Sequence, residues 1–397
     1  MFSLKNKLSP DLKIAVENKI YKSFRVIIHC KNLQKNIESK ISSYKGSLIR
    51  SITKCSLISA QLTPHAIERL IEFPEVNYIS FDKYSYICGN SIQSSNGIRL
   101  AEKYKLTGKG IGIGIIDTGV YPHSDLINPV NRIKHFVDLI NGCKYPYDDN
   151  GHGTFVSGLI GGNGLSSKGI YKGIAENSSI CCYKAFNSKG RAYISDVLYS
   201  IQGIIEQSKE LNIRVLCLPF EIAEYDFLVN SYFSILFEEA AKANIITIVP
   251  SGSNDNIEGS IRGLAILPNC ITVGGIDTSK DKTSYKYSSS GPVAKLEKPD
   301  LVAACVDIIG LNCNSNYISE RKGSKVYPYA LEDPYTSYSG TSCAAAYIAG
   351  ICALLLENNP NLGFKDILSL LKVSCNLIEI PKALQGSGVI NINKLLP

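Results

Sequence analysis

Three short segments carry residue types that could together activate a serine hydroxyl. Asp117 ends an apolar run and is followed by Thr-Gly, His152 stands between two glycines ahead of an apolar helix, and Ser342 opens a second apolar helix. A serine hydroxyl is a weak nucleophile until a base removes its proton, and histidine is that base when a carboxylate fixes its tautomer. The three segments therefore hold a candidate carboxylate, Asp117, a candidate base, His152, and a candidate nucleophile, Ser342.

Each of these residues taken alone has a simpler explanation. An aspartate that ends a strand often caps a helix, an isolated histidine can be a packed side chain, and a serine before an apolar helix is ordinarily its N-cap. The joint occurrence of D-T-G, G-H-G-T-x-x-x-G and G-T-S-x-A-A, in that order along the chain, favours the catalytic interpretation.

The elements that must position these residues begin near Gly110. Apolar runs at 111–116, 179–183, 213–218, 245–250 and 269–275 predict strands, and helical patterns lie near 153–161, 193–209 and 229–243. Strands that are apolar throughout and alternate with helices indicate an α/β fold with a mostly parallel, doubly wound sheet. In such a fold the site lies at the carboxyl ends of the strands.

The first quarter of the chain has a different pattern. It predicts strands at 24–30, 47–52, 56–62 and 76–81 with helices at 31–43 and 64–72, a βαββαβ order typical of a small ferredoxin-like α+β domain. The stretch after it lacks an apolar period. We predict a small domain over 1–90, a linker and processing region over 91–97, with cleavage somewhere in 85–97, and a large domain over 98–397.

The charge distribution supports this division. Lys and Arg total 42 against 35 Asp and Glu, a net charge of +7, and residues 1–90 hold 14 basic and 7 acidic side chains, which leaves 28 of each beyond them. The excess of positive charge therefore marks a domain boundary, and no nucleic-acid recognition motif accompanies the basic segment. We expect no nucleic-acid or membrane partner, because the longest apolar run, 343–356, has the length of a buried core helix.

Cysteine usage and the first residues bear on the compartment. The 13 cysteines include no C-x-x-C pair, and free thiols in this number fit a reducing compartment. The first 19 residues are too polar for a secretory signal. We predict a cytoplasmic protein and leave a non-standard export route open.

The motifs resemble the subtilases, the subtilisin-like serine proteases, over about residues 98–397, and most of all their intracellular, AprX-like branch. The resemblance extends to four further stretches: PYDDNGHGT (146–154), SSSGP (288–292), KPDLVAACVDI (298–308) and YTSYSGTSCAAAYIAG (335–350). It implies a serine endopeptidase (hydrolase) that cleaves protein or peptide substrates through an acyl-enzyme, with Asp117 as the orienting carboxylate, His152 as the general base and acid, and Ser342 as the nucleophile. It also implies a self-processed zymogen whose N-terminal domain is the inhibitory propeptide. Because that domain carries the excess of positive charge, we expect its inhibition to depend on salt.

The first departure from the family concerns the oxyanion donor. The family has an Asn in an A-G-N segment, whereas this chain has PSGSN at 250–254. A gap-free match places Ser253 at that position and Asn254 one residue later, so both remain candidate oxyanion donors. Loss of such a donor costs on the order of 3–4 kcal/mol of transition-state stabilisation.

The second departure lies in the strand expected to bind substrate. The family pattern N-x-S-x-G is replaced by CLPFE at 217–221. We predict substrate contacts at Leu218, Pro219, Glu221 and Gly252; Pro219 lacks an N–H, and Glu221 puts bulk and charge where the family has glycine. The cleft is then narrower than usual. The alternative is a catalytically impaired pseudoprotease that acts as a binding or regulatory module.

No cofactor or metal site is predicted. Asp148 and Asp149 could hold a structural calcium ion, but no D-x-D-x-D-G loop is present, and we interpret both as solvated loop charges. Cys343, beside the nucleophile, is interpreted as a small packing residue.

Overall fold

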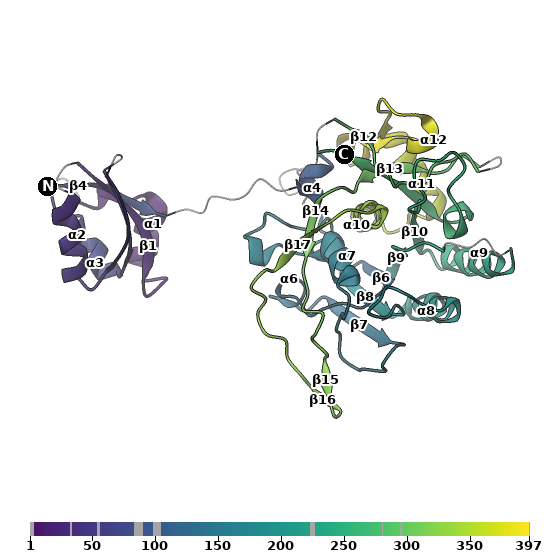
Figure 1. Cartoon of the computed structure of the whole chain (residues 1–397), viewed down its shortest axis with the longest axis horizontal. Helices are drawn as coiled ribbons and strands as arrows, with labels where there is room; N and C mark the ends of the chain where they lie inside the picture. The colour runs from purple at the N-terminus through teal and green to yellow at the C-terminus, as the bar shows by residue number, and fades with distance from the viewer. Residues whose placement is uncertain are drawn as a thin grey trace. The chain divides into compact units, whose positions relative to one another are not determined.

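The chain consists of two compact units, Met1–Cys88 and Gly89–Pro397 (Figure 1). The computed structural model describes residues 4–31, 34–53, 56–82, 90–97, 105–222, 227–279, 281–293 and 296–396. Each unit is described by itself, and each encloses a hydrophobic core of its own.

The first unit is a four-stranded antiparallel sheet in the order β2-β3-β1-β4, with helices α2 and α3. Buried and partly exposed residues alternate along β1, because successive side chains of a strand point to opposite faces. The predicted βαββαβ order is present, preceded by two further helices. The bounds are η1 Leu4–Lys7, α1 Pro10–Glu17, β1 Phe24–Cys30, α2 Gln34–Ser43, β2 Ser47–Ile52, β3 Leu57–Leu62, α3 Pro64–Leu70 and β4 Val76–Phe81.

The second unit is built on a large, mostly parallel sheet in the order β18-β19-β13-β11-β10-β9-β6-β8-β7, with β12 paired to β11. The five predicted strands correspond to β6, β8, β9, β10 and β11, within two residues at each end. The bounds are β6 Gly112–Asp117, β7 Ile133–Asp138, β8 Ser179–Lys184, β9 Ile213–Cys217, β10 Ile246–Pro250, β11 Ile271–Asp277, β12 Thr283–Ser284, β13 Leu301–Ala304, β18 Cys375–Asn376 and β19 Val389–Ile390.

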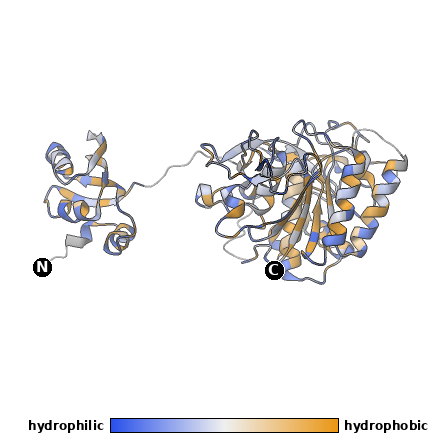
Figure 2. Ribbon diagram, turned by 90° about the horizontal axis from the view of Figure 1, so that it is seen from below, coloured by the Kyte–Doolittle hydropathy of each residue, from blue (hydrophilic) through white to orange (hydrophobic). Residues whose placement is uncertain are grey.

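Helices cover both faces of this sheet, as the doubly wound prediction requires. Helices α7 (His152–Gly161) and α10 (Thr341–Asn358) pack on one face, and α8 (Ile194–Gln207) and α9 (Phe227–Lys242) pack on the other. Figure 2 shows the hydrophobic residues of this unit concentrated in the strands and on the helix faces turned toward them. The strands are apolar throughout because neither face of the sheet meets water.

Helix α10 is apolar on all sides. In the part of the chain that the structure describes, it is the one helix whose length and hydropathy would allow a membrane span, and 89% of it is buried inside the protein. Burial explains the composition, since a helix enclosed by sheet and neighbouring helices has no polar face. The prediction of a core helix at 343–356 is confirmed.

The prediction of a linker at 91–97 is wrong. Strand β5 (Asn90–Ser91) pairs in parallel with β14, and Ile92 of α4 (Ile92–Ser95) is 1% exposed. Residues 90–97 therefore belong to the second unit. They show no hydrophobic periodicity, but the β5–β14 pairing and the buried side chain of Ile92 anchor them. The remaining elements are α6 Ser124–Ile127, η3 Leu165–Ser167, η4 Gly263–Ile266, β14 Ile308–Leu311, β15 Glu320–Arg321, β16 Ser324–Lys325, β17 Tyr335–Tyr338, α11 Phe364–Ser374, α12 Lys382–Gln385 and α13 Ile392–Leu395.

Candidate active site

The three residues predicted to act together lie within hydrogen-bonding distance of one another. His152 Nδ1 is 2.9 Å from each carboxylate oxygen of Asp117, and His152 Nε2 is 3.1 Å from Ser342 Oγ. The side chain of His152 is 22% exposed and that of Asp117 is 4% exposed. A buried carboxylate, an imidazole and a hydroxyl in this sequence form a chain that can withdraw the hydroxyl proton.

Each member of this triad stands at an element boundary. Asp117 is the last residue of β6, at the carboxyl end of the parallel sheet, His152 is the first residue of α7, and Ser342 is the second residue of α10. A parallel sheet brings such ends to one edge. Ser342 lies in the first turn of α10, where the backbone N–H groups have no partner one turn earlier in the helix; the Cys343 N–H donates to Gly340 O at 2.9 Å.

A glycine lets the histidine approach the aspartate. A Cβ at Gly153 would lie 2.1 Å from the carbonyl oxygen of Gly119 and 3.1 Å from Asp117 Cβ. The Gly153 N–H instead donates to Thr118 Oγ1 at 3.0 Å. This contact joins the start of α7 to the end of β6, and so fixes the separation of His152 and Asp117.

The surroundings of His152 favour its charged form. Burial would lower its pKa, but the charge and hydrogen bond of Asp117, with the charge of Asp148, together raise the pKa above its ordinary value. The ring of Tyr338 lies edge-on to the imidazole, with centroids 5.6 Å apart. Tyr338 lies within the YTSYSGTS stretch of the sequence, but no role was predicted for it.

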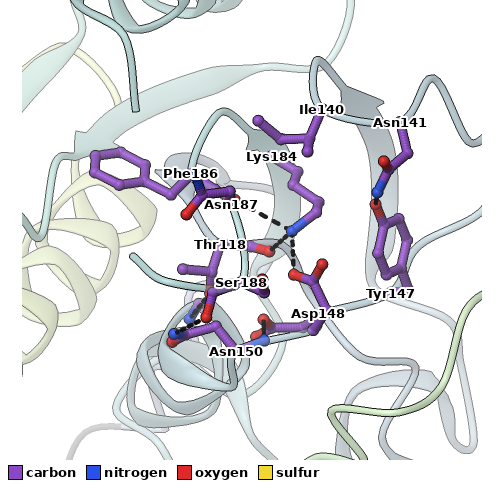
Figure 3. Close-up of polar contacts among 12 residues, drawn as sticks. Thr118, Ile140, Asn141, Tyr147, Asp148, Asn150, Lys184, Phe186, Asn187 and Ser188 are labelled. Carbon is purple, nitrogen blue, oxygen red and sulfur yellow. Dashed lines mark hydrogen bonds and ion pairs between the residues drawn. The ribbon is translucent and has the colours of Figure 1, made fainter. Parts of the chain in front are cut away.

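Lys184 is a residue near the triad that the sequence reasoning missed. It ends β8 beside Asp117, is fully buried, and its ammonium donates to Thr118 O at 2.5 Å, Asp149 Oδ1 at 2.6 Å and Phe186 O at 3.2 Å. Figure 3 shows this side chain reaching the Thr118 carbonyl. A lysine that ends an otherwise apolar strand is the signal that could have identified it, because buried ammonium groups need several oxygen partners.

The interpretation of Asp148 and Asp149 as solvated loop charges is wrong. Asp148 is fully buried and accepts four hydrogen bonds, from the N–H groups of Asn150 and Gly151 and from the N–H and hydroxyl of Thr154, at 2.7–3.0 Å. Its carboxylate therefore holds the start of α7, where it accepts from the N–H of Thr154 and from the N–H of Gly151, the residue before the helix. Asp149 pairs with Lys184. Among the described residues, no group of three His, Cys, Asp or Glu side chains could hold a metal ion.

A cavity of about 330 Å³ adjoins the triad. Its lining includes Ser342 and His152, and also three of the predicted substrate-binding residues, namely Pro219, Glu221 and Gly252. Ser253 lines it as well, whereas Asn254 is not among the lining residues. Of the two candidate oxyanion donors, Ser253 therefore lines the same cavity as the nucleophile.

The two candidate oxyanion donors both bond to Glu221. Glu221 Oε2 accepts from Ser253 N at 2.9 Å and from Asn254 Nδ2 at 3.2 Å, and Oε1 accepts from the Ser253 hydroxyl. Gly252, with φ +102°, forms the turn beneath this carboxylate. The predicted bulk and charge of Glu221 therefore lie on the 252–254 turn.

The prediction that Leu218 binds substrate is wrong. Its side chain is fully buried in the core under α8 and α9, its N–H donates to Ile248 O at 3.0 Å, and its carbonyl accepts from Phe220 N at 2.9 Å. The residue is 0% exposed, so a substrate cannot reach it. An apolar residue that continues a buried strand is more simply a core residue.

Cys343 follows the nucleophile but points into the core. It is fully buried, and burial raises the pKa of its thiol to about 12. The interpretation of a packing residue agrees with this burial. The eleven cysteines in the described ranges are all free.

The chain is similar to known proteins in sequence and in fold. Residues 108–388 match the Subtilase family, Peptidase_S8. The chain is 31% identical to Serine protease AprX of Bacillus subtilis over 382 residues (92% of this chain, 83% of the relative), and 26% identical to Alkaline protease of Alkalihalobacillus alcalophilus (87% and 80%). Among solved structures, Sphericase shares the fold with a TM-score of 0.57 and 21% identity, covering 74% of this chain and 91% of that one. Because the family match spans most of the sequence, the chain belongs to the subtilase family and is a subtilisin-like serine protease.

Proposed function

We propose that this chain is a serine endopeptidase that works through Asp117, His152 and Ser342. The observation that carries the proposal is the continuous hydrogen-bonded chain from the Asp117 carboxylate through His152 to Ser342 Oγ. Ser342 Oγ attacks the scissile carbonyl carbon while His152 Nε2 takes the hydroxyl proton. His152 then gives that proton to the leaving amine, and water hydrolyses the acyl-enzyme by the same route in reverse.

The negative charge on the carbonyl oxygen needs donors when the tetrahedral intermediate forms. The first turn of α10 supplies backbone N–H groups next to Ser342. We propose Ser253, rather than Asn254, as the side-chain donor, because Ser253 lines the cavity that holds Ser342. Its single hydroxyl hydrogen, which bonds to Glu221 Oε1 in the free protein, turns to the carbonyl oxygen when the intermediate forms. Ser253→Ala should then lower kcat while leaving KM nearly unchanged.

Labelling by a fluorophosphonate probe tests the central proposal. Wild-type protein should be labelled, and Ser342→Ala and His152→Ala should be silent while keeping the wild-type melting temperature within a few degrees. A correctly folded wild-type protein that resists labelling would contradict the proposal and favour the pseudoprotease alternative.

We further propose that the protein is made as a zymogen, with the first unit as its inhibitory propeptide. The support is that this unit has a core of its own and carries the entire excess of positive charge. Mass spectrometry of purified wild-type protein should find the first unit removed, and Ser342→Ala should remain intact. Inhibition by the first unit should weaken as salt is raised.

A reducing, cytoplasmic location is proposed as well. Its support is that the eleven described cysteines are free. Titration of thiols in denaturant without reductant should count all 13 cysteines; a count lower by an even number would indicate disulfides and contradict the proposed compartment.

A further inference from the structure

The arrangement around Glu221 bears on which substrates the site accepts. Among the described residues that line the cavity beside Ser342, Glu221 is the one carboxylate. Its side chain is exposed rather than buried, so a group that enters the cavity can reach it.

The carboxylate is held in place by neutral donors. Ser253 supplies its N–H and its hydroxyl, and Asn254 supplies an amide N–H. Arg262 donates to Asn254 Oδ1 at 2.5 Å, which requires the amide oxygen on that side and turns Nδ2 toward Glu221. Because all three donors on Glu221 are uncharged, they fix the position of the carboxylate without cancelling its charge.

One acceptor site of the carboxylate remains open. The two oxygens of a carboxylate offer about four lone-pair sites. Two donors bond to Oε2 and one bonds to Oε1, so Oε1 can accept one more hydrogen bond, from a group in the cavity. The rings of Tyr285 and Tyr287 line the same cavity and suit the methylene stem of a long cationic side chain.

We infer that Glu221 is a specificity-determining residue that selects a lysine or arginine side chain on the acyl side of the scissile bond. This inference rests on the proposed protease function. Because Ser342 and Glu221 line the same cavity, the side chain of the residue whose carbonyl Ser342 attacks can enter it and reach Glu221. Its ammonium or guanidinium donates to Glu221 Oε1 and forms an ion pair that an uncharged side chain of equal length lacks.

Matched peptide substrates test the inference. They differ at that single residue, which is lysine, norleucine or glutamate, and kcat/KM is measured at low and high salt. Wild-type protein should prefer lysine to norleucine by about tenfold or more at low salt, with a smaller ratio at high salt. The ratio is taken within one variant, so a loss of catalytic efficiency common to all substrates cancels.

Three variants complete the design. Glu221→Gln should bring the lysine-to-norleucine ratio close to one, and Glu221→Lys should reverse the preference toward glutamate. The control Glu297→Gln removes a remote, 77% exposed carboxylate and should keep the wild-type ratio. A ratio that stays at its wild-type value in Glu221→Gln would overturn the inference.

Probe labelling separates this failure from failure of the proposed function. Wild-type protein that is labelled at Ser342 and shows no lysine preference would overturn the role of Glu221 alone. Folded wild-type protein that is not labelled would overturn both.

Discussion

The ammonium nitrogen of Lys184 lies 2.5 Å from the carbonyl oxygen of Thr118, the residue that follows Asp117. The hydroxyl of Thr118 accepts from the N–H of Gly153, the residue that follows His152. One buried cation thus fixes the segment from which both the aspartate and the histidine of the triad are positioned. Lys184 is a positioning residue, because it acts through Thr118 and makes no contact with the reacting hydroxyl.

Lys184→Met should destabilise the protein strongly. The substitution leaves Asp149 without its partner and two carbonyls without a donor, and breaking a buried pair in this way costs about 3–5 kcal/mol of unfolding free energy. Denaturant unfolding measures the loss. Lys382→Met is the matched control, since its pair with Glu297 is 69% and 77% exposed and should contribute about 0–1 kcal/mol. Equal losses in the two variants would contradict the expected contribution of the buried Lys184–Asp149 pair to stability.

The pH profile of kcat/KM should show an acid limb above the pKa of an ordinary histidine. His152 must be neutral to act as a base, and its pKa is raised in the folded protein, so activity is lost at a higher pH than an unperturbed imidazole would give. The same pKa shift makes folding stability depend on pH in the opposite direction to activity. A raised folded pKa adds stability below the unfolded pKa, and this contribution disappears as the pH rises through the folded value.

Asp148→Asn tests the origin of this shift. Removal of one negative charge near His152 should move the acid limb to lower pH. The exposed Asp333→Asn is the control and should leave the limb in place. An acid limb that does not move in Asp148→Asn would mean that Asp117 alone sets the pKa.

Gly153→Ala should impair both folding and activity. The added Cβ would lie 2.1 Å from the Gly119 carbonyl, so the start of α7 must shift, at a cost of about 1–3 kcal/mol. Gly161→Ala, at the other end of the same helix, meets its nearest atom at 3.3 Å and should change stability by less than about 1 kcal/mol. Thermal unfolding and probe labelling of the two variants provide the comparison.

The processed protein should keep residues 90–97. Besides the β5–β14 pairing, Gln93 Nε2 donates to Gly173 O at 2.8 Å, and Asn96 Oδ1 accepts from Ala304 N at 3.0 Å. A protease binds extended, accessible chain, so a cut inside this segment would require its local unfolding. N-terminal sequencing of the mature protein should begin at or before Asn90; a start within 91–97 would contradict the assignment.

Individual residues show which features of the structure a local sequence pattern can predict. Apolar runs with helical stretches between them located the five main strands, because a strand buried on both faces must be apolar throughout. The triad was identified from residue type, flanking glycines and chain order. The prediction for Leu218 was wrong because one sequence pattern fits both a buried strand end and a substrate-binding strand. The burial of Ile92 was not predicted because a single apolar side chain gives no hydrophobic periodicity.

Periodicity along the chain was enough to predict the doubly wound fold class and the small domain before it. The residues that flank Asp117, His152 and Ser342 carried the family resemblance from which the triad is proposed. The contacts of Lys184 and Asp148 next to the triad, and the convergence of Ser253 and Asn254 on Glu221, became visible only in the folded chain. This is because the residues next to a charged side chain in the sequence do not show whether that side chain is exposed to water or buried. Its partners, which come from distant segments, decide whether it is solvated or holds a site together.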